Sequence, residues 1–136
     1  METILKTDCK FLENELMDVV RLFEARPGNV AHSFVYRDGV FYNRFSVDGK
    51  EYSFEDEGQV SGEIEYKRME RRFGKLGLYA ILSDLYQEKM PWGALTGIRP
   101  TKLAYMEKES GRDFRALFEK MRVSEENISL VEEVLK

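Results

Sequence analysis

Alternation of apolar and polar residues in the first half of the chain predicts a three-stranded antiparallel meander. The three runs are rich in aromatic and β-branched residues, which favour strands, and they cover residues 30–37, 40–47 and 50–54. An Asp-Gly pair separates each run from the next, and this pair is a preferred two-residue hairpin turn. A short strand over residues 2–6 and a helix capped by Asp8 are predicted before the meander.

The two turns also predict which residues face each other, because a two-residue loop fixes the register of its hairpin. The first turn places His32 opposite Phe45, and the second places Phe45 opposite Tyr52. Both turns put the same apolar set on one face of the sheet: Val30, Phe34, Tyr36, Phe41, Phe45, Val47, Tyr52 and Phe54. We therefore expect this face to pack on helices, and the face that carries Arg44 and Ser53 to be open to solvent.

The second half of the chain has helical periodicity. A long helix from Ser61 to about Lys89 is apolar on two sides, which is typical of a helix between two layers. We expect the sheet on one side of it and the C-terminal helices on the other. Further helices are predicted over residues 100–111, 113–122 and 124–136, the last one capped by Ser124.

These elements define an α+β fold class. The chain begins with a short strand and a helix and continues with the meander. A helical C-terminal half follows, and we expect it to pack on one face of the sheet. We expect a single domain over residues 1–136, with a β-rich half at 1–57 and a helical half at 61–136. The last helix has no C-cap glycine, so we expect the chain to belong to a longer protein.

Composition narrows the chemistry that the chain can perform. Cys9 is the single cysteine and His32 the single histidine, so we expect no metal site and no catalytic residue. His32 falls beside Phe45 on the predicted core face and is expected to be a packed histidine, and Cys9 an inert small side chain. The net charge of −4 argues against a nucleic-acid partner. No membrane helix or signal peptide is apparent, so we expect a cytoplasmic protein with no membrane partner.

Residues 91–102 form the strongest candidate site. A glycine-bearing loop before a helix N-terminus offers backbone N–H groups and a positive dipole end to a phosphate or carboxylate. The spacing of its glycines is not that of a P-loop. The same segment also fits a structural connector, in which Trp92 and Ile98 fill the core and Arg99 pairs with a carboxylate. The candidate residues are Trp92, Gly97, Arg99, Thr101 and Lys102.

A second candidate is a basic stripe on the long helix. Its four residues follow the spacing of one helix face and are Arg68, Arg71, Arg72 and Lys75. Such a stripe fits an anionic partner, and it equally fits an ordinary solvated face balanced by neighbouring glutamates.

The segment Leu95-Thr96-Gly97-Ile98-Arg99-Pro100-Thr101-Lys102, with Pro91-Trp92-Gly93 before it, resembles a family signature. The family is the coproporphyrinogen dehydrogenases, or oxygen-independent coproporphyrinogen III oxidase-like radical S-adenosylmethionine proteins, and the signature lies just upstream of their catalytic core. The preceding helix, with Lys67-Arg68 and Leu78-Tyr79, is similar to that family's basic helix. The resemblance covers residues 63–136.

The resemblance implies an N-terminal accessory domain of an oxidoreductase of haem biosynthesis. The family binds a [4Fe–4S] cluster and S-adenosylmethionine through a Cys-x-x-x-Cys-x-x-Cys motif, which this chain lacks. We therefore expect these cofactors in the parent protein and no catalysis in this chain. Expected partners are the parent's own radical S-adenosylmethionine barrel and an anionic porphyrinogen, whose propionates would suit Arg99 and Lys102. The alternative is a stand-alone anion- or nucleotide-binding module that uses the Gly93–Lys102 loop.

Overall fold

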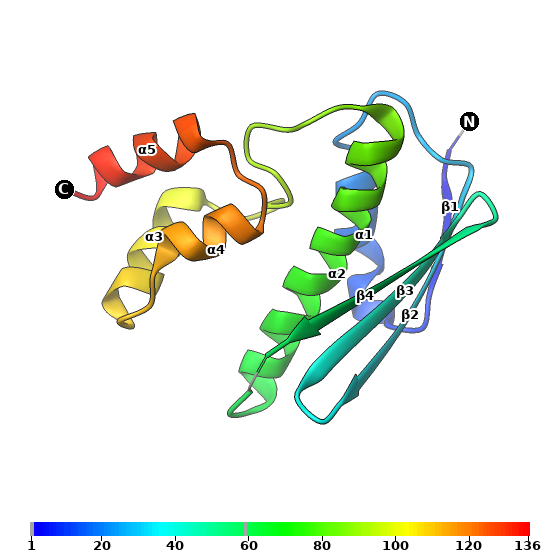
Figure 1. Cartoon of the computed structure of the whole chain (residues 1–136), viewed down its shortest axis with the longest axis horizontal. Helices are drawn as coiled ribbons and strands as arrows, with labels where there is room; N and C mark the ends of the chain where they lie inside the picture. The colour runs from blue at the N-terminus through cyan, green and yellow to red at the C-terminus, as the bar shows by residue number, and fades with distance from the viewer. Residues whose placement is uncertain (1, 59) are drawn as a thin grey trace. The chain divides into compact units, whose positions relative to one another are not determined.

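The computed structural model describes residues 2–58 and 60–136, and its fold is α+β with a helical C-terminal half, as the sequence predicts. Two compact units divide the chain, Met1–Glu88 and Lys89–Lys136. The first unit contains a sheet and the long helix α2 (Glu63–Tyr86), and the second contains three short helices (Figure 1). The long helix therefore belongs to the same unit as the sheet.

The sheet has four strands in the order β1-β2-β3-β4. Their bounds are Ile4–Thr7, Asn29–Arg37, Val40–Val47 and Lys50–Glu57. The first strand, β1, pairs with β2 in parallel, while β2, β3 and β4 form the antiparallel meander. The predicted register is confirmed: His32 faces Phe45, and Phe45 faces Tyr52. Both residues of each Asp-Gly turn have positive φ, the geometry of a type I′ turn.

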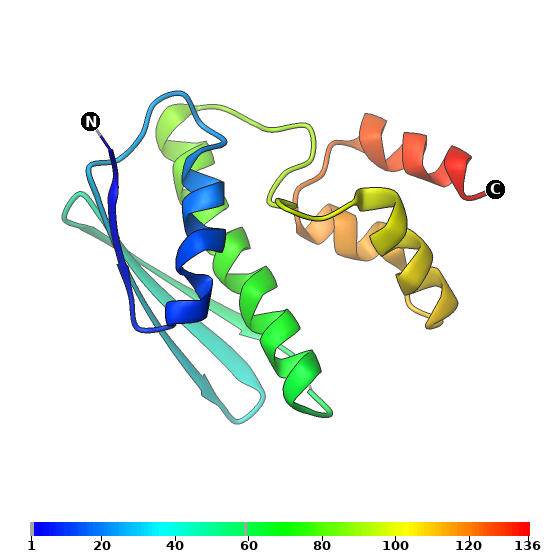
Figure 2. The same cartoon turned by 180° about the vertical axis from the view of Figure 1, so that it is seen from behind.

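The core of the first unit lies between one sheet face and two helices. The short 3₁₀ helix η1 (Lys10–Leu12) leads into α1 (Glu13–Val20), and α1 and α2 lie on the same side of the sheet (Figures 1 and 2). Phe45 is fully buried on this side, and Arg44 is exposed on the other. A Cβ atom at Gly77 would lie 2.9 Å from Cε2 of Phe45, so a glycine lets α2 approach the sheet closely.

Two of the predicted helix caps are wrong. The Asp8 carboxylate does not cap α1; it accepts hydrogen bonds from the Phe34 backbone N–H at 3.2 and 3.3 Å, and so fixes the end of β1 to β2. Ser61 does not cap α2, which begins at Glu63 after Gly62. Its hydroxyl donates to Glu65 Oε2 at 2.9 Å instead. Aspartate and serine satisfy local N–H groups in several loop geometries, and their position alone does not select the cap.

The second unit contains α3 (Pro100–Glu109), α4 (Phe114–Lys120) and α5 (Glu125–Val134). The predicted Ser124 cap is confirmed, because its side chain accepts from the Asn127 N–H of α5 at 3.2 Å. The structure adds a cap at Asp113, whose side chain accepts from the first turn of α4. Pro100 occupies the first turn of α3, where its missing N–H costs no hydrogen bond.

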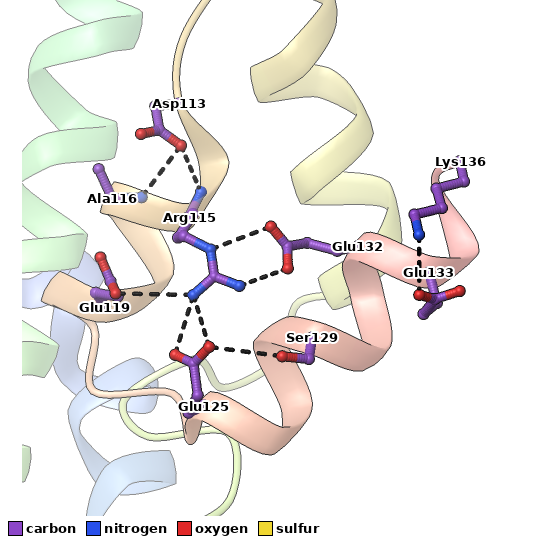
Figure 3. Close-up of polar contacts among 9 residues, drawn as sticks. All are labelled: Asp113, Arg115, Ala116, Glu119, Glu125, Ser129, Glu132, Glu133 and Lys136. Atoms are coloured by element: carbon purple, nitrogen blue, oxygen red, sulfur yellow. Dashed lines mark hydrogen bonds and ion pairs between the residues drawn. The ribbon is translucent and has the colours of Figure 1, made fainter.

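Arg115 ties α4 to α5. Its guanidinium donates to Glu125 at 2.8 Å and forms a two-point contact with Glu132, with Glu119 3.8 Å away (Figure 3). Two-point arginine–carboxylate contacts have a fixed geometry, so Arg115 sets how the two helices meet. None of the helices in the described part of the chain combines the length and apolarity that a bilayer span needs.

Candidate functional site

The first half of the 91–102 segment is anchored to the connection between α4 and α5. The Pro91 carbonyl accepts from the Ser124 N–H at 2.9 Å and from Asn127 Nδ2 at 3.1 Å. The Ala94 N–H donates to the Met121 carbonyl at 2.8 Å. Ala94 is fully buried and Trp92 is half-buried. This half of the segment is a structural connector.

Gly93 makes this anchoring possible. Its φ is 55°, and a Cβ atom there would lie 2.2 Å from the Met121 carbonyl oxygen and 2.4 Å from the Arg122 carbonyl. No side chain fits at that distance, so two backbone segments touch at this point because the residue is glycine.

The second half of the segment is open. Gly97 is exposed, has a φ of 65°, and a Cβ atom there would meet nothing within 4 Å. Arg99, Thr101 and Lys102 are exposed as well, and Ile98 is 40% exposed. A shallow pocket of about 280 Å³ lies between the end of this segment and α3. Its lining residues are Gly97, Ile98, Arg99, Lys102, Leu103 and Met106. Thr101 and Trp92 lie outside this lining.

Arg99 is not a clamp of its own unit. Its backbone is extended, with φ −83° and ψ 112°, as expected for a residue that precedes proline. Its guanidinium is exposed and forms no ion pair with any residue that the structure describes. Two other arginines of this unit form ion pairs with carboxylates. Arg115 pairs with Glu132, and Arg112 Nη2 lies 2.7 Å from Glu107 Oε2.

The N-terminus of α3 differs from those of α4 and α5. No side chain caps it, whereas Asp113 and Ser124 cap the other two helices. Arg99 is the N-cap residue of α3, and Lys102 lies in its first turn. Both cations of the pocket are thus close to the positive end of the helix dipole.

The basic stripe does not form one exposed surface. Lys75 is buried, with its Nζ 3.8 Å from Glu15 Oε1, and Arg71 Nε donates to Glu15 Oε2 at 2.9 Å. Burial lowers the pKa of Lys75, against the opposing effect of Glu15. Arg68 and Arg72 are half-buried. Arg71 and Lys75 both contact Glu15 of α1, so this part of the stripe holds α1 and α2 together.

A buried polar network, which the sequence did not predict, lies under α2. His32 Nε2 is 2.7 Å from Asn43 Oδ1, and His32 Nδ1 is 2.7 Å from the Thr7 hydroxyl. The ring of His32 packs 4.7 Å from that of Phe45, which confirms the expected packed histidine. Burial lowers the pKa of His32, so the ring is neutral at pH 7.

The Cys9 thiol is held by a buried carboxyl group. Its Sγ–H donates to Glu70 Oε1 at 3.1 Å, and Glu70 is 4% exposed. Burial, and then the hydrogen bond to Glu70, raise the pKa of Cys9 to about 12. A thiol with this pKa is protonated at neutral pH and is a poor nucleophile. No sequence pattern points to this pair, because its two members are 61 positions apart.

A larger open hollow of about 620 Å³ in the second unit includes Arg112, Glu132 and Lys136 in its lining. These three charges are already paired, with Glu107, Arg115 and Glu133 respectively. Among the residues that the structure describes, no group of three or more His, Cys, Asp or Glu side chains could hold a metal ion. Comparison with family models, with curated proteins and with solved structures finds no match.

Proposed function

We propose that this chain is a non-catalytic accessory domain of a cytoplasmic radical S-adenosylmethionine oxidoreductase. The parent resembles the oxygen-independent coproporphyrinogen III oxidases of haem biosynthesis and carries the [4Fe–4S] cluster and S-adenosylmethionine. The Gly97–Lys102 part of the signature faces the catalytic barrel or its anionic substrate. Arg99 and Lys102 supply the positive charge.

The observation that supports this function is the division of the 91–102 segment. Its first half is fixed by hydrogen bonds to Ser124, Asn127 and Met121. Its second half exposes Arg99 and Lys102 beside a pocket. A rigid base under an exposed cationic tip is the arrangement expected of a segment that meets a partner, because little conformational entropy is then lost on binding.

The cysteine content supports the proposal that the cluster chemistry takes place outside this chain. A cluster that binds S-adenosylmethionine needs three cysteine ligands, and Cys9 is the single cysteine of the chain. Its thiol is engaged with Glu70. The proposed domain therefore contributes binding and positioning, and the chemistry lies in the part of the parent that carries the three-cysteine motif.

The reading frame downstream of Lys136 tests the proposal. We expect it to continue into a Cys-x-x-x-Cys-x-x-Cys segment. The full-length protein, reconstituted with iron and sulfide, should then show cluster absorbance and cleave S-adenosylmethionine, while the 136-residue chain alone should take up no stoichiometric cluster. A stop codon at the next position, or a cluster on the monomeric chain, would refute the proposal.

A stand-alone anion- or nucleotide-binding module remains the second candidate. The observation in its favour is the N-terminus of α3, where no side chain occupies the N-cap role and Gly97 leaves the backbone open. This function predicts that the 136-residue chain binds inorganic phosphate or ATP by itself. Calorimetric titration with both probes tests it, with Arg99→Ala as the matched variant.

A further inference from the structure

We propose that the pocket on α3 receives a large apolar side chain of a protein partner, with carboxylates beside it, and does not bind a small-molecule anion. The partner is the catalytic barrel of the parent, so this inference rests on the proposed function. The proposed function allows either the barrel surface or the anionic substrate to contact this pocket, and the present inference selects the barrel surface.

The size of the pocket is the first argument. Its volume is about 280 Å³, at the small end of the range of about 300–1,000 Å³ found for sites that enclose and largely bury drug-sized molecules or cofactors. A tetrapyrrole or a nucleotide would lie mainly outside such a pocket. One large side chain fits it, and protein interfaces are commonly organised around such an anchored side chain.

The lining of the pocket is the second argument. Three of its six lining residues are apolar, Ile98, Leu103 and Met106, and two of these are substantially exposed, Ile98 at 40% and Met106 at 46%. Burying exposed apolar surface favours association, and methionine adapts its shape to a partner side chain. A site for a phosphate alone would not need these apolar side chains in its lining.

Charge is the third argument, and it selects the kind of partner. Arg99 and Lys102 line the same pocket, are exposed, and form no ion pair with any described residue. Lys102 and Met106 lie one helical turn apart, so a cation and an apolar contact stand side by side on α3. The complementary surface has an apolar side chain with Asp or Glu next to it.

Hydrogen exchange on two proteins tests the inference. The amides of residues 97–106 are compared between the 136-residue chain and the full-length protein. We expect exchange in the full-length protein to slow by at least about tenfold at these amides, because docking must open before they exchange. Inorganic phosphate or ATP, added to the 136-residue chain, should leave the same amides unchanged.

Charge-reversal and truncation variants of the full-length protein locate the contact. Lys102→Glu and Met106→Ala should remove the protection. Lys108→Glu and Tyr105→Ala should retain it, because both residues are exposed on the same helix and lie outside the lining of the pocket. Circular dichroism of each variant checks that the helices are intact. Loss of protection in the control variants to the same extent would overturn the inference.

The remaining outcomes separate the two proposals. A full-length protein with the three-cysteine motif but no protection at residues 97–106 overturns the docking inference and leaves the proposed function in place. Protection by phosphate or ATP overturns the inference and supports the anion-binding module. A reading frame without the motif overturns the proposed function and the docking inference with it.

Discussion

His32 and Asn43 share a buried hydrogen bond of 2.7 Å between Nε2 and Oδ1, and both residues are almost completely buried. An amide oxygen accepts only, so Nε2 carries the proton and Nδ1 accepts from the Thr7 hydroxyl. That hydroxyl in turn accepts from the Cys9 backbone N–H at 3.0 Å. The neutral ring thus joins β1, β2 and β3 in one chain of hydrogen bonds. Protonation of Nδ1 would remove the acceptor that the Thr7 hydroxyl uses in this chain.

The first prediction is that this network makes the first unit sensitive to acid. Burial lowers the pKa of His32 in the folded state, so the unfolded chain takes up its proton first, near its ordinary pKa of about 6.5. The stabilisation is complete above about pH 6.5 and decreases as the pH falls below that value. Urea midpoints measured between about pH 7.5 and pH 5 should decrease for the wild type and change less for His32→Gln. Equal slopes for the two proteins would contradict the assignment.

The second prediction concerns Glu70 and has the opposite sign. Burial raises its pKa, although the Cys9 thiol, Lys67 and Arg71 oppose the shift. The folded protein therefore holds this proton to a higher pH than the unfolded chain does, and stability is lost as the pH rises through the folded pKa. Glu70→Gln keeps an acceptor for the Cys9 thiol and removes the buried charge. It should raise the urea midpoint at pH 7, and the gain should vanish in acid.

The third prediction tests the two faces of the sheet. Phe45 is fully buried and Arg44, its neighbour in β3, is exposed. Phe45→Ala should cost about 3–5 kcal/mol of unfolding free energy, because it leaves a cavity in the core. Arg44→Ala should cost less than about 0.5 kcal/mol. Chemical denaturation followed by far-ultraviolet circular dichroism measures both values, and similar costs for the two variants would contradict the face assignment.

The meander could be predicted from the sequence because its information is local. Each Asp-Gly turn fixes one hairpin, and the two hairpins share β3, so every pair in the register follows. The Ser124 cap is local in the same way. By contrast, the parallel position of β1 and the Cys9–Glu70 pair depend on how distant segments pack, and no turn or periodicity encodes that.

The candidate site was predictable in part for the same reason. The exposed cations Arg99 and Lys102 follow from the loop and the helix start at Pro100. The anchoring of Gly93 against Met121 could not be predicted, because the two residues are far apart in the sequence. The role of Met106 in the pocket lining could not be predicted. In the sequence Met106 is only an apolar residue one helical turn after Lys102, and a core position would have the same spacing.

The fourth prediction separates the two glycines of the signature segment. Both have positive φ, but a Cβ at Gly93 would collide with the Met121 carbonyl, while one at Gly97 would meet nothing within 4 Å. Gly97→Ala should cost about 1 kcal/mol, from its left-handed backbone alone. Gly93→Ala should cost clearly more, because backbone must move. The fluorescence of Trp92, the single tryptophan and a residue of the second unit, reports both unfolding transitions.

The last prediction compares two arginines of the second unit. Arg99 is exposed and without an ion pair among the described residues, so Arg99→Ala should change the unfolding free energy by less than about 0.5 kcal/mol. Arg112 donates from Nε to Glu107 Oε2 at 2.8 Å, and the Glu107 side chain is only 5% exposed. Arg112→Ala should cost about 1–3 kcal/mol, because it leaves a buried carboxylate without its donor.

Urea unfolding followed by Trp92 fluorescence measures both arginine variants on the same protein. The comparison bears directly on function, because a residue that contributes nothing to the stability of its own unit is free to serve a partner. A loss of about 3 kcal/mol or more in Arg99→Ala would mean that Arg99 is a clamp. It would also remove the main support for a functional Gly97–Lys102 loop. A neutral Arg99→Ala beside a destabilised Arg112→Ala would leave Arg99 available to the partner that its exposure and charge predict.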